Sequence, residues 1–241
     1  MERLQKESGS GRGEETAGKL SIVATPIGNL GDLTFRALWN MKEAAAIYAE
    51  DTRVISKLLA HYGLRTSVFR LDAATEGKKA EEVAERLTRG EHVVYVTDAG
   101  TPGISDPGAR LVAYVRAHVP DAIIDAIPGP SAVTALLSIA GIDMSEFAFL
   151  GFPPHKKGRQ TFVSRIAKID MPVVLYESPH RILKLLEEIG KAAPKARVTI
   201  GRELTKLHEE VIQGSPKDLA MQLEKKKAVR GEFVLIIEPR N

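Results

Sequence analysis

Short apolar segments alternate with longer amphipathic ones along most of the chain. The apolar segments are rich in Val and Ile and have strand length: 20–25, 45–49, 66–71, 92–97, 122–127, 147–152, 172–177, 197–203, 208–213 and 232–238. Between many of them, apolar residues recur at helical spacing, as in 182–189. This alternation predicts an α/β chain with a largely parallel sheet in its first half. The last strands lie closer together, which predicts more antiparallel pairing there.

The Pro-Gly-Pro turn in "IPGPSA" (127–132) is the best candidate for a domain boundary. A chain of 241 residues is long enough for one large or two small domains. We therefore expect one α/β domain over 19–127 and a second over 128–241. The first 18 residues are polar and contain no hydrophobic signal core, which predicts a disordered tail over 1–18.

Composition removes several classes of function. The chain has no cysteine, which excludes disulfides, thiolate zinc sites and a cysteine nucleophile. No apolar run approaches the roughly 20 residues of a membrane span, so we expect a cytoplasmic protein. The net charge of +3 is compatible with an anionic partner but does not by itself indicate one.

The stretch "TDAGTPGISDPG" (97–108) follows an apolar strand and is the most unusual loop in the chain. Its glycines and prolines favour a rigid loop that presents backbone N–H and C=O groups, and no Lys or Arg lies between 93 and 109. Asp98 would repel a phosphate and attract a sulfonium or an ammonium group. The alternative is a purely structural turn.

Five other stretches carry polar residues next to predicted strand ends. "TPIGNLGD" (25–32) matches neither a dinucleotide fingerprint nor a P-loop, and Asp32 is a plausible cap for the helix that follows. "PGPSA" could present Ser131 to a ligand. "YESPHR" (176–181) permits either acid–base chemistry or a capped helix start, and "RELTK" (202–206) either a site or a surface charge network. "PPHKKGR" (153–159) could contact phosphates or be merely solvated.

Taken in order, these motifs, with "AEDTR" (49–53) and "RGEFVL" (230–235), identify a resemblance over about residues 19 to 239. The chain resembles the ribosomal RNA small subunit methyltransferase I branch of the tetrapyrrole methylase superfamily. The resemblance implies two α/β domains of tetrapyrrole-methylase type with the S-adenosylmethionine cleft between them. It also implies 2′-O-methylation of a cytidine ribose in the decoding region of small-subunit (16S) rRNA, no metal, and a homodimer.

The resemblance also assigns residues to the cofactor. Those implied are Pro26, Asp98, Ala99, Gly100, Thr101, Pro102, Ile104, Ser131, Ala132, Tyr176, Leu204, Glu232 and Phe233. A ribose hydroxyl needs a proton acceptor, and the candidates for that catalytic role are Glu177, Asp51 and Glu203, with Lys206 as an electrostatic helper. The residues expected to face RNA are Asn29, Glu50, Arg53, Lys156, Lys157, Arg159 and Arg181.

One segment departs from the family's pattern. The family usually has His-Asn-Glu after the third strand, whereas this chain has "LDAATEG" and retains only Glu76. Longer members also carry a further C-terminal segment. Two other functions stay open at this point: a tetrapyrrole or precorrin C-methyltransferase, and a non-catalytic RNA-binding relic of the fold.

Overall fold

The computed structural model describes residues 17–104 and 107–238. Within them the chain forms two compact units, one of residues 17–23, 38–96 and 107–127, the other of 24–37, 97–104 and 128–238. A single cut after residue 127, as the sequence predicts, misses the two loops that group with the second unit. The reason is packing, since Ile27 in the first of these loops is buried in a hydrophobic cluster of the second unit. The expected tail at 1–18 lies, except for its last two residues, outside the described part of the chain.

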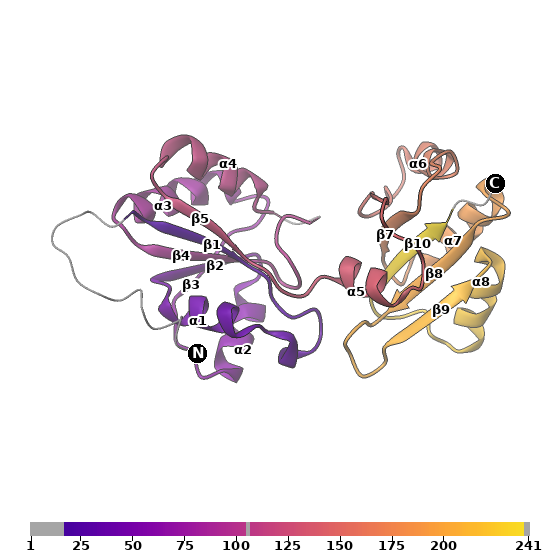
Figure 1. The fold of residues 1–241 in the computed structure, drawn as a ribbon, viewed down its shortest axis with the longest axis horizontal. Coiled ribbons are helices and arrows are strands. Elements are labelled where there is room, and N and C mark those ends of the chain that lie inside the picture. The colour runs from indigo at the N-terminus through magenta and orange to yellow at the C-terminus, as the bar shows by residue number, and fades with distance from the viewer. Residues whose placement is uncertain (1–16, 105–106, 239–241) are drawn as a thin grey trace. The chain divides into compact units, whose positions relative to one another are not determined.

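The first unit is built on a parallel sheet in the order β3-β2-β4-β1-β5. Its strands are β1 (Lys19–Val23), β2 (Ala46–Ala49), β3 (Val68–Arg70), β4 (His92–Val96) and β5 (Ile123–Ile127). Helices α3 (Glu76–Thr88) and α4 (Ala109–His118) lie on one side of the sheet, and α1 (Phe35–Glu43) and α2 (Thr52–His61) on the other (Figure 1). The core beneath α3 and α4 includes Tyr48, Val83, Tyr95 and Leu111.

The second unit has a mixed sheet in the order β6-β7-β10-β8-β9. Only β6 and β7 pair in parallel, and the other neighbours are antiparallel. The strands are β6 (Ala148–Phe149), β7 (Val173–Glu177), β8 (Arg197–Arg202), β9 (Glu210–Gly214) and β10 (Phe233–Glu238), and the helices are α5 (Ala132–Ile139), α6 (Arg159–Ile166), α7 (Ile182–Ala192) and α8 (Pro216–Lys225). Each of the ten segments predicted as strands overlaps one in the structure, and the change from parallel to antiparallel pairing is confirmed.

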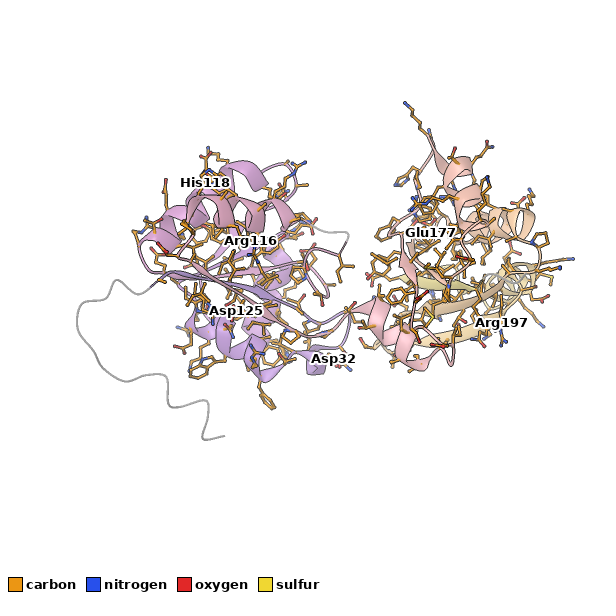
Figure 2. The ribbon with its side chains drawn as sticks, turned by 45° about the horizontal axis from the view of Figure 1, so that its top comes forward. Asp32, Arg116, His118, Asp125, Glu177 and Arg197 are labelled. Carbon is orange, nitrogen blue, oxygen red and sulfur yellow. The ribbon has the colours of Figure 1, made fainter. Side chains whose placement is uncertain are left out.

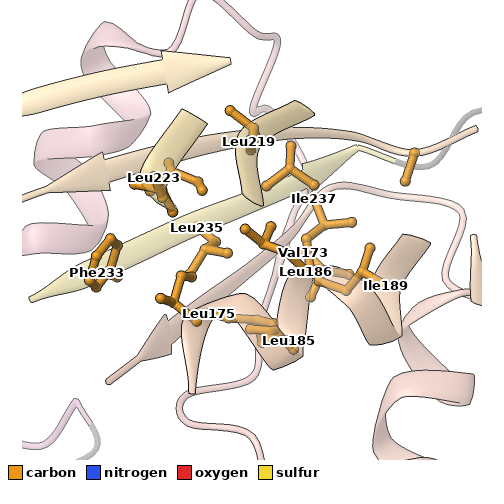
Figure 3. Close-up of a cluster of buried hydrophobic side chains, with 14 of the residues drawn as sticks. Val173, Leu175, Leu185, Leu186, Ile189, Leu219, Leu223, Phe233, Leu235 and Ile237 are labelled. Atoms are coloured by element: carbon orange, nitrogen blue, oxygen red, sulfur yellow. The ribbon is translucent and has the colours of Figure 1, made fainter. Parts of the chain in front are cut away.

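Alternate residues of the central strands serve two different cores in the second unit. Leu175 and Leu235 pack with Leu185 of α7 and Leu223 of α8 on one face of the sheet (Figure 3). On the other face, Val174 and Val234 pack with α5 and with the loop that carries Ile27. Burying a Leu or Val side chain contributes about 1.5–3 kcal/mol, so both faces stabilise this sheet.

The start of α1 differs from the prediction that Asp32 caps it. Asp32 instead ends a short 3₁₀ helix, η2 (Leu30–Asp32), which Asn29 caps by accepting a hydrogen bond from the Gly31 N–H. The hydroxyl of Thr34 accepts from the Ala37 N–H, at 3.1 Å, and so caps α1. The observed cap lies two residues after the predicted one, and such an offset is expected because Asp, Asn and Thr all make caps.

Candidate functional site

Three loops follow the carboxyl ends of adjacent strands of the parallel sheet. They are residues 24–28 after β1, 97–104 after β4 and 128–131 after β5, and β1 lies between β4 and β5 in the sheet. Ligands of open α/β sheets bind at this edge. The three loops hold eight of the residues that the sequence assigns to the cofactor: Pro26, Asp98, Ala99, Gly100, Thr101, Pro102, Ile104 and Ser131. Two further predicted residues, Asn29 for the RNA and Ala132 for the cofactor, directly follow the first and third loops.

Backbone hydrogen bonds join the first two loops. The Thr25 N–H donates to the Gly100 carbonyl and the Gly100 N–H donates to the Thr25 carbonyl, both at 3.0 Å. The Thr25 hydroxyl donates to the Thr97 carbonyl at 3.2 Å. Gly100 has a φ of +83°, which other residues rarely adopt, so this pairing requires glycine at that position.

The third loop is tied to the other two by one hydrogen bond and one close approach. The Thr101 hydroxyl donates to the Pro130 carbonyl at 3.0 Å. A Cβ at Gly129 would lie 3.0 Å from the Cβ of Ala24. The three hydrogen-bonded loops thus form one polar surface, and none of them contains a Lys or Arg.

The far end of the 97–108 segment is held by Glu76, the one residue of the family's His-Asn-Glu pattern that this chain retains. Glu76 is 4% exposed, and its Oε1 accepts hydrogen bonds from the N–H groups of Gly108, Arg110 and Leu111 at 2.9–3.2 Å. A carboxylate at a helix N-terminus satisfies otherwise unpaired N–H groups. Glu76 is therefore the cap of α4, and it is positioned by the segment in which the family's His-Asn pair is missing.

The residues present fit a sulfonium-bearing cofactor with a polar rim. Thr97 Oγ1 is buried and has no hydrogen-bond partner within the described residues, so a polar group remains available at the strand end. The space where a Cβ of Gly103 would lie is open. Neither feature would hold a triphosphate, which requires cationic neutralisation.

Predicted cofactor residues from the second unit fall into two groups. Ala132, Tyr176 and Leu204 pack on the same hydrophobic cluster as Ile27, beside the three loops. Phe233 does not, because its side chain is 3% exposed in the opposite core with Leu175 and Leu185 (Figure 3). The buried position of the Phe233 side chain argues against its predicted contact with the cofactor. Strand alternation is the reason, since the next residue of β10, Val234, packs in the opposite core.

The "RELTK" turn reaches the first loop through a lysine. A Cβ on Gly28 would lie only 2.3 Å from the Cγ of Lys206, so the lysine stem crosses directly over this glycine. The Lys206 ammonium lies 2.9 Å from Glu203 Oε1 and 3.0 Å from Glu232 Oε2. Glu203 and Thr205 have φ values of +50° and +67°, and such strain in non-glycine residues is concentrated at functional sites.

Lys206, Glu203 and Glu232 stabilise one another's charges. Burial alone would lower the pKa of Lys206, but its hydrogen bonds to Glu203 and Glu232 outweigh burial and raise it. Burial alone would raise the pKa of Glu203, but hydrogen bonds from the Lys206 ammonium and the Glu232 N–H lower it instead. At neutral pH the lysine is therefore a cation and Glu203 an anion.

Asp51, Glu50 and Arg53 lie after β2 in the first unit. Asp51 caps α2 by accepting from the Arg53 N–H at 2.8 Å, and it also pairs with the Arg53 guanidinium. The side-chain hydrogen bond from Arg53, followed by the backbone one, lowers the pKa of Asp51 to about 2. A carboxylate of such low basicity is a poor general base, which argues against the catalytic role predicted for Asp51. Arg53 is exposed and able to meet a phosphate.

Glu177, at the end of β7 in the second unit (Figure 2), is buried rather than exposed to solvent. It is 1% exposed, and its carboxylate pairs with Arg181 at 2.6 Å and with Arg159 at 3.5 Å. Arg159 is itself only 4% exposed. These contacts argue against Glu177 as a base and against Arg159 as an RNA ligand, because neither side chain reaches solvent. Lys156 and Lys157 are exposed, as their predicted role requires.

No group of three or more His, Asp or Glu side chains is arranged to hold a metal ion within residues 17–104 and 107–238. No helix in the same described ranges is long and apolar enough to cross a membrane.

Comparison with known proteins agrees with this architecture. The family model of tetrapyrrole (corrin/porphyrin) methylases matches residues 19–220. The chain is 39% identical over 226 residues to ribosomal RNA small subunit methyltransferase I of Hydrogenobaculum sp. (strain Y04AAS1), covering 92% of this chain and 96% of that protein. A protein of the same name from Borrelia garinii subsp. bavariensis is 41% identical over 221 residues, with coverage of 90% and 97%.

Solved structures extend the likeness at the level of fold. The cobalamin biosynthetic enzyme cobalt precorrin-4 methyltransferase, CbiF, superimposes with a TM-score of 0.67 at 19% identity, covering 91% of this chain and 94% of that one. Uroporphyrin-III-C-methyltransferase from Thermus thermophilus superimposes with a TM-score of 0.64 at 19% identity, covering 92% of this chain and 94% of that one. At this identity the likeness shows the fold alone.

Proposed function

The chain belongs to the tetrapyrrole (corrin/porphyrin) methylase family and, within it, to the ribosomal RNA small subunit methyltransferase I proteins, and from this premise we propose that it methylates small-subunit rRNA with S-adenosylmethionine as the methyl donor. The acceptor in this proposal is the 2′-hydroxyl of a cytidine in the decoding region. The observation that carries the proposal is identity of 39–41% over at least nine tenths of both chains.

The residues proposed to hold the donor are those of the three joined loops. Backbone groups of 97–104 and the buried Thr97 hydroxyl supply polar contacts, and Ala132, Tyr176 and Leu204 supply apolar area beside Ile27. When bound, S-adenosylmethionine supplies an electrophilic methyl carbon on a sulfonium, a chemistry that needs no metal. The protein's task is then mainly to position the acceptor oxygen, about 3 Å from that carbon.

Lys206 is the side chain best placed to act on the acceptor. Its ammonium stays charged at neutral pH, and it is held over Gly28 by two carboxylates. A fixed cation stabilises negative charge that develops on an oxygen during the reaction. Of the three carboxylates predicted as proton acceptors, Glu203 is the one in contact with this lysine. Because the pKa of Glu203 is itself lowered by that contact, we propose that Glu203 positions Lys206 rather than accepts the proton.

The direct test is methyl transfer to purified 30S subunits with radiolabelled S-adenosylmethionine, followed by nuclease digestion and mass spectrometry of the nucleosides. The expected product is 2′-O-methylcytidine, and Lys206→Met should reduce its rate at least tenfold while cofactor affinity is retained. Label on a base, on another nucleoside, or only on an added porphyrinogen would contradict the proposal. A chain that failed to bind S-adenosylmethionine in calorimetry would instead be a non-catalytic relic.

A homodimer is also part of the proposal. It is supported by the family resemblance and by two large aromatic side chains of α1, Phe35 at 91% exposed and Trp39 at 57% exposed. Exposed apolar patches of this kind often mark an interface. Light scattering should give twice the chain's 26.3 kDa, and Phe35→Glu with Trp39→Glu should give the monomer mass.

A further inference from the structure

Two arginines hydrogen-bond to the backbone of the basic loop "PPHKKG" (153–158). Arg181 Nη1 donates to the Pro153 carbonyl at 2.9 Å, and Arg159 Nη1 donates to the Pro154 carbonyl at 3.1 Å. The next three residues, His155, Lys156 and Lys157, are all exposed. The cations of the loop therefore project from a backbone whose first two carbonyls are fixed.

A single carboxylate holds both arginines. Glu177, at the end of β7, lies 2.6 Å from Arg181 and 3.5 Å from Arg159, and its side chain is fully buried. Its Oε1 also accepts from the Ser178 N–H at 2.8 Å. Arg159 makes a second pair with Glu188 of α7, at 2.8 Å, and Arg181 Nε donates to the Ser178 hydroxyl. Two cations and two anions thus form one nearly neutral cluster.

Stability alone does not account for such a cluster. Buried ion pairs are often no more stabilising than apolar residues of the same volume, because desolvation offsets their attraction. Here the Arg159 Nη2 atom and Glu177 Oε2 are buried without a hydrogen-bond partner among the described residues, so the network is not optimised for its own energy. What the cluster does achieve is to fix one geometry for the exposed loop.

We propose that Glu177 is a positioning residue that acts through Arg181 and Arg159 to hold Lys156 and Lys157 in place for RNA phosphates. This role rests on the proposed function, since it assumes an RNA acceptor. Holding long side chains in advance reduces the entropy lost on binding, and phosphate contacts fix the register of the RNA without reading its sequence. Glu177 thereby affects RNA affinity and leaves the transfer step unchanged.

The test compares Glu177→Gln with the control Glu187→Gln, which removes a carboxylate from an exposed ion pair on α7. The first readout needs no substrate: trypsin cleavage after Lys156 and Lys157, mapped by mass spectrometry, should accelerate at least tenfold in Glu177→Gln only. The second is binding of an rRNA fragment, which should weaken about tenfold with a shallower dependence on salt. The turnover number at saturating RNA and the affinity for S-adenosylhomocysteine should stay within twofold.

A double-mutant cycle with the variant Lys156→Ala, Lys157→Ala distinguishes positioning of the two lysines by Glu177 from a general loss of stability. If Glu177 acts through the lysines, adding Glu177→Gln to that double variant should weaken RNA binding no further. Additive losses, unchanged trypsin cleavage, or a fall in cofactor affinity would overturn the proposal. If Glu177→Gln does not fold, Arg181→Lys takes its place, because lysine keeps the charge but lacks the planar fork that reaches both Glu177 and Pro153.

The two proposals fail in distinguishable ways. If the wild-type chain does not methylate 30S subunits but trypsin cleavage still accelerates in Glu177→Gln, then Glu177 does position the loop, and the loop binds something other than this RNA. If the wild type methylates rRNA, but Glu177→Gln changes neither trypsin cleavage nor RNA binding, the proposed function stands and the positioning role of Glu177 is wrong.

Discussion

The two loop systems of the second unit are held in opposite ways. The loops at 24–28, 97–104 and 128–131 are joined by backbone hydrogen bonds and close glycine contacts, and contain no cation. The loop at 153–158 is cationic and is anchored by buried guanidinium groups. Neutral backbone suits a small cofactor that carries its own positive charge, whereas fixed cations suit a polyanion. The difference indicates that donor and acceptor are recognised by separately built parts, which mutation should be able to separate.

The largest expected effect concerns Gly28, where the Lys206 side chain passes over the loops that contain no cation. In Gly28→Ala, the added methyl group would occupy the position of the Lys206 stem and displace the ammonium. Turnover should fall about a hundredfold, because a small misplacement at a reacting centre is costly. Steady-state kinetics measures this. Gly77→Ala is the control, since a Cβ there meets nothing within 4 Å. An equal loss of turnover in both variants would contradict the role proposed for Lys206.

Glu76→Ala should give the next largest effect, because it removes the acceptor of three backbone N–H groups at the start of α4. The free energy of unfolding should fall by about 3 kcal/mol. Affinity for S-adenosylhomocysteine should also fall, because the end of the 97–108 segment is released. Urea denaturation and calorimetry measure the two effects. Glu81→Ala, at an exposed position of the same helix, should change neither, and loss of RNA affinity alone in Glu76→Ala would contradict this role.

A smaller pair of effects tests whether the two loop systems are independent. Thr101→Val removes one hydrogen bond, to Pro130, and should weaken cofactor binding about fivefold, equivalent to about 1 kcal/mol, with RNA affinity unchanged. Lys156→Ala with Lys157→Ala should do the reverse and reduce the salt dependence of RNA binding by between one and two charges. If each variant altered both affinities, the two sets of loops would be coupled rather than separate.

The smallest expected effect concerns pH. Because the folded-state pKa of Glu203 is lowered, its pairing stabilises the protein above the unfolded pKa and is lost as pH falls through the folded value. Because the pKa of Lys206 is raised, its contribution is present below the unfolded pKa and is lost as pH rises through the folded one. The stability difference between wild type and Lys206→Met should therefore be constant near neutrality, below about 1 kcal/mol, and shrink below about pH 4. A difference that changed between pH 6 and 8 would contradict this assignment.

Much of the fold could be predicted from the sequence. Strand positions follow from short Val- and Ile-rich runs, and the change to antiparallel pairing follows from their closer spacing, because both patterns are local. The absence of cations in 97–104 is likewise a property of the chain, and it is preserved however the chain folds. The caps were less predictable, since Asn29, Asp32 and Thr34 are all capping residues within one short segment.

Burial and pairing were decided by the tertiary structure. Arg159 stands in a run of basic residues that looks solvated, yet it lies inside the second unit against Glu177, which is 18 positions away along the chain. Glu76 reaches Gly108 across a separation of 32 residues. No local pattern encodes such contacts, because they depend on which strands become neighbours and on which charges can be neutralised once water is excluded. The sequence determined where strands end and which chemistry stands there, and the tertiary structure decided which of those side chains face a ligand and which hold the others in place.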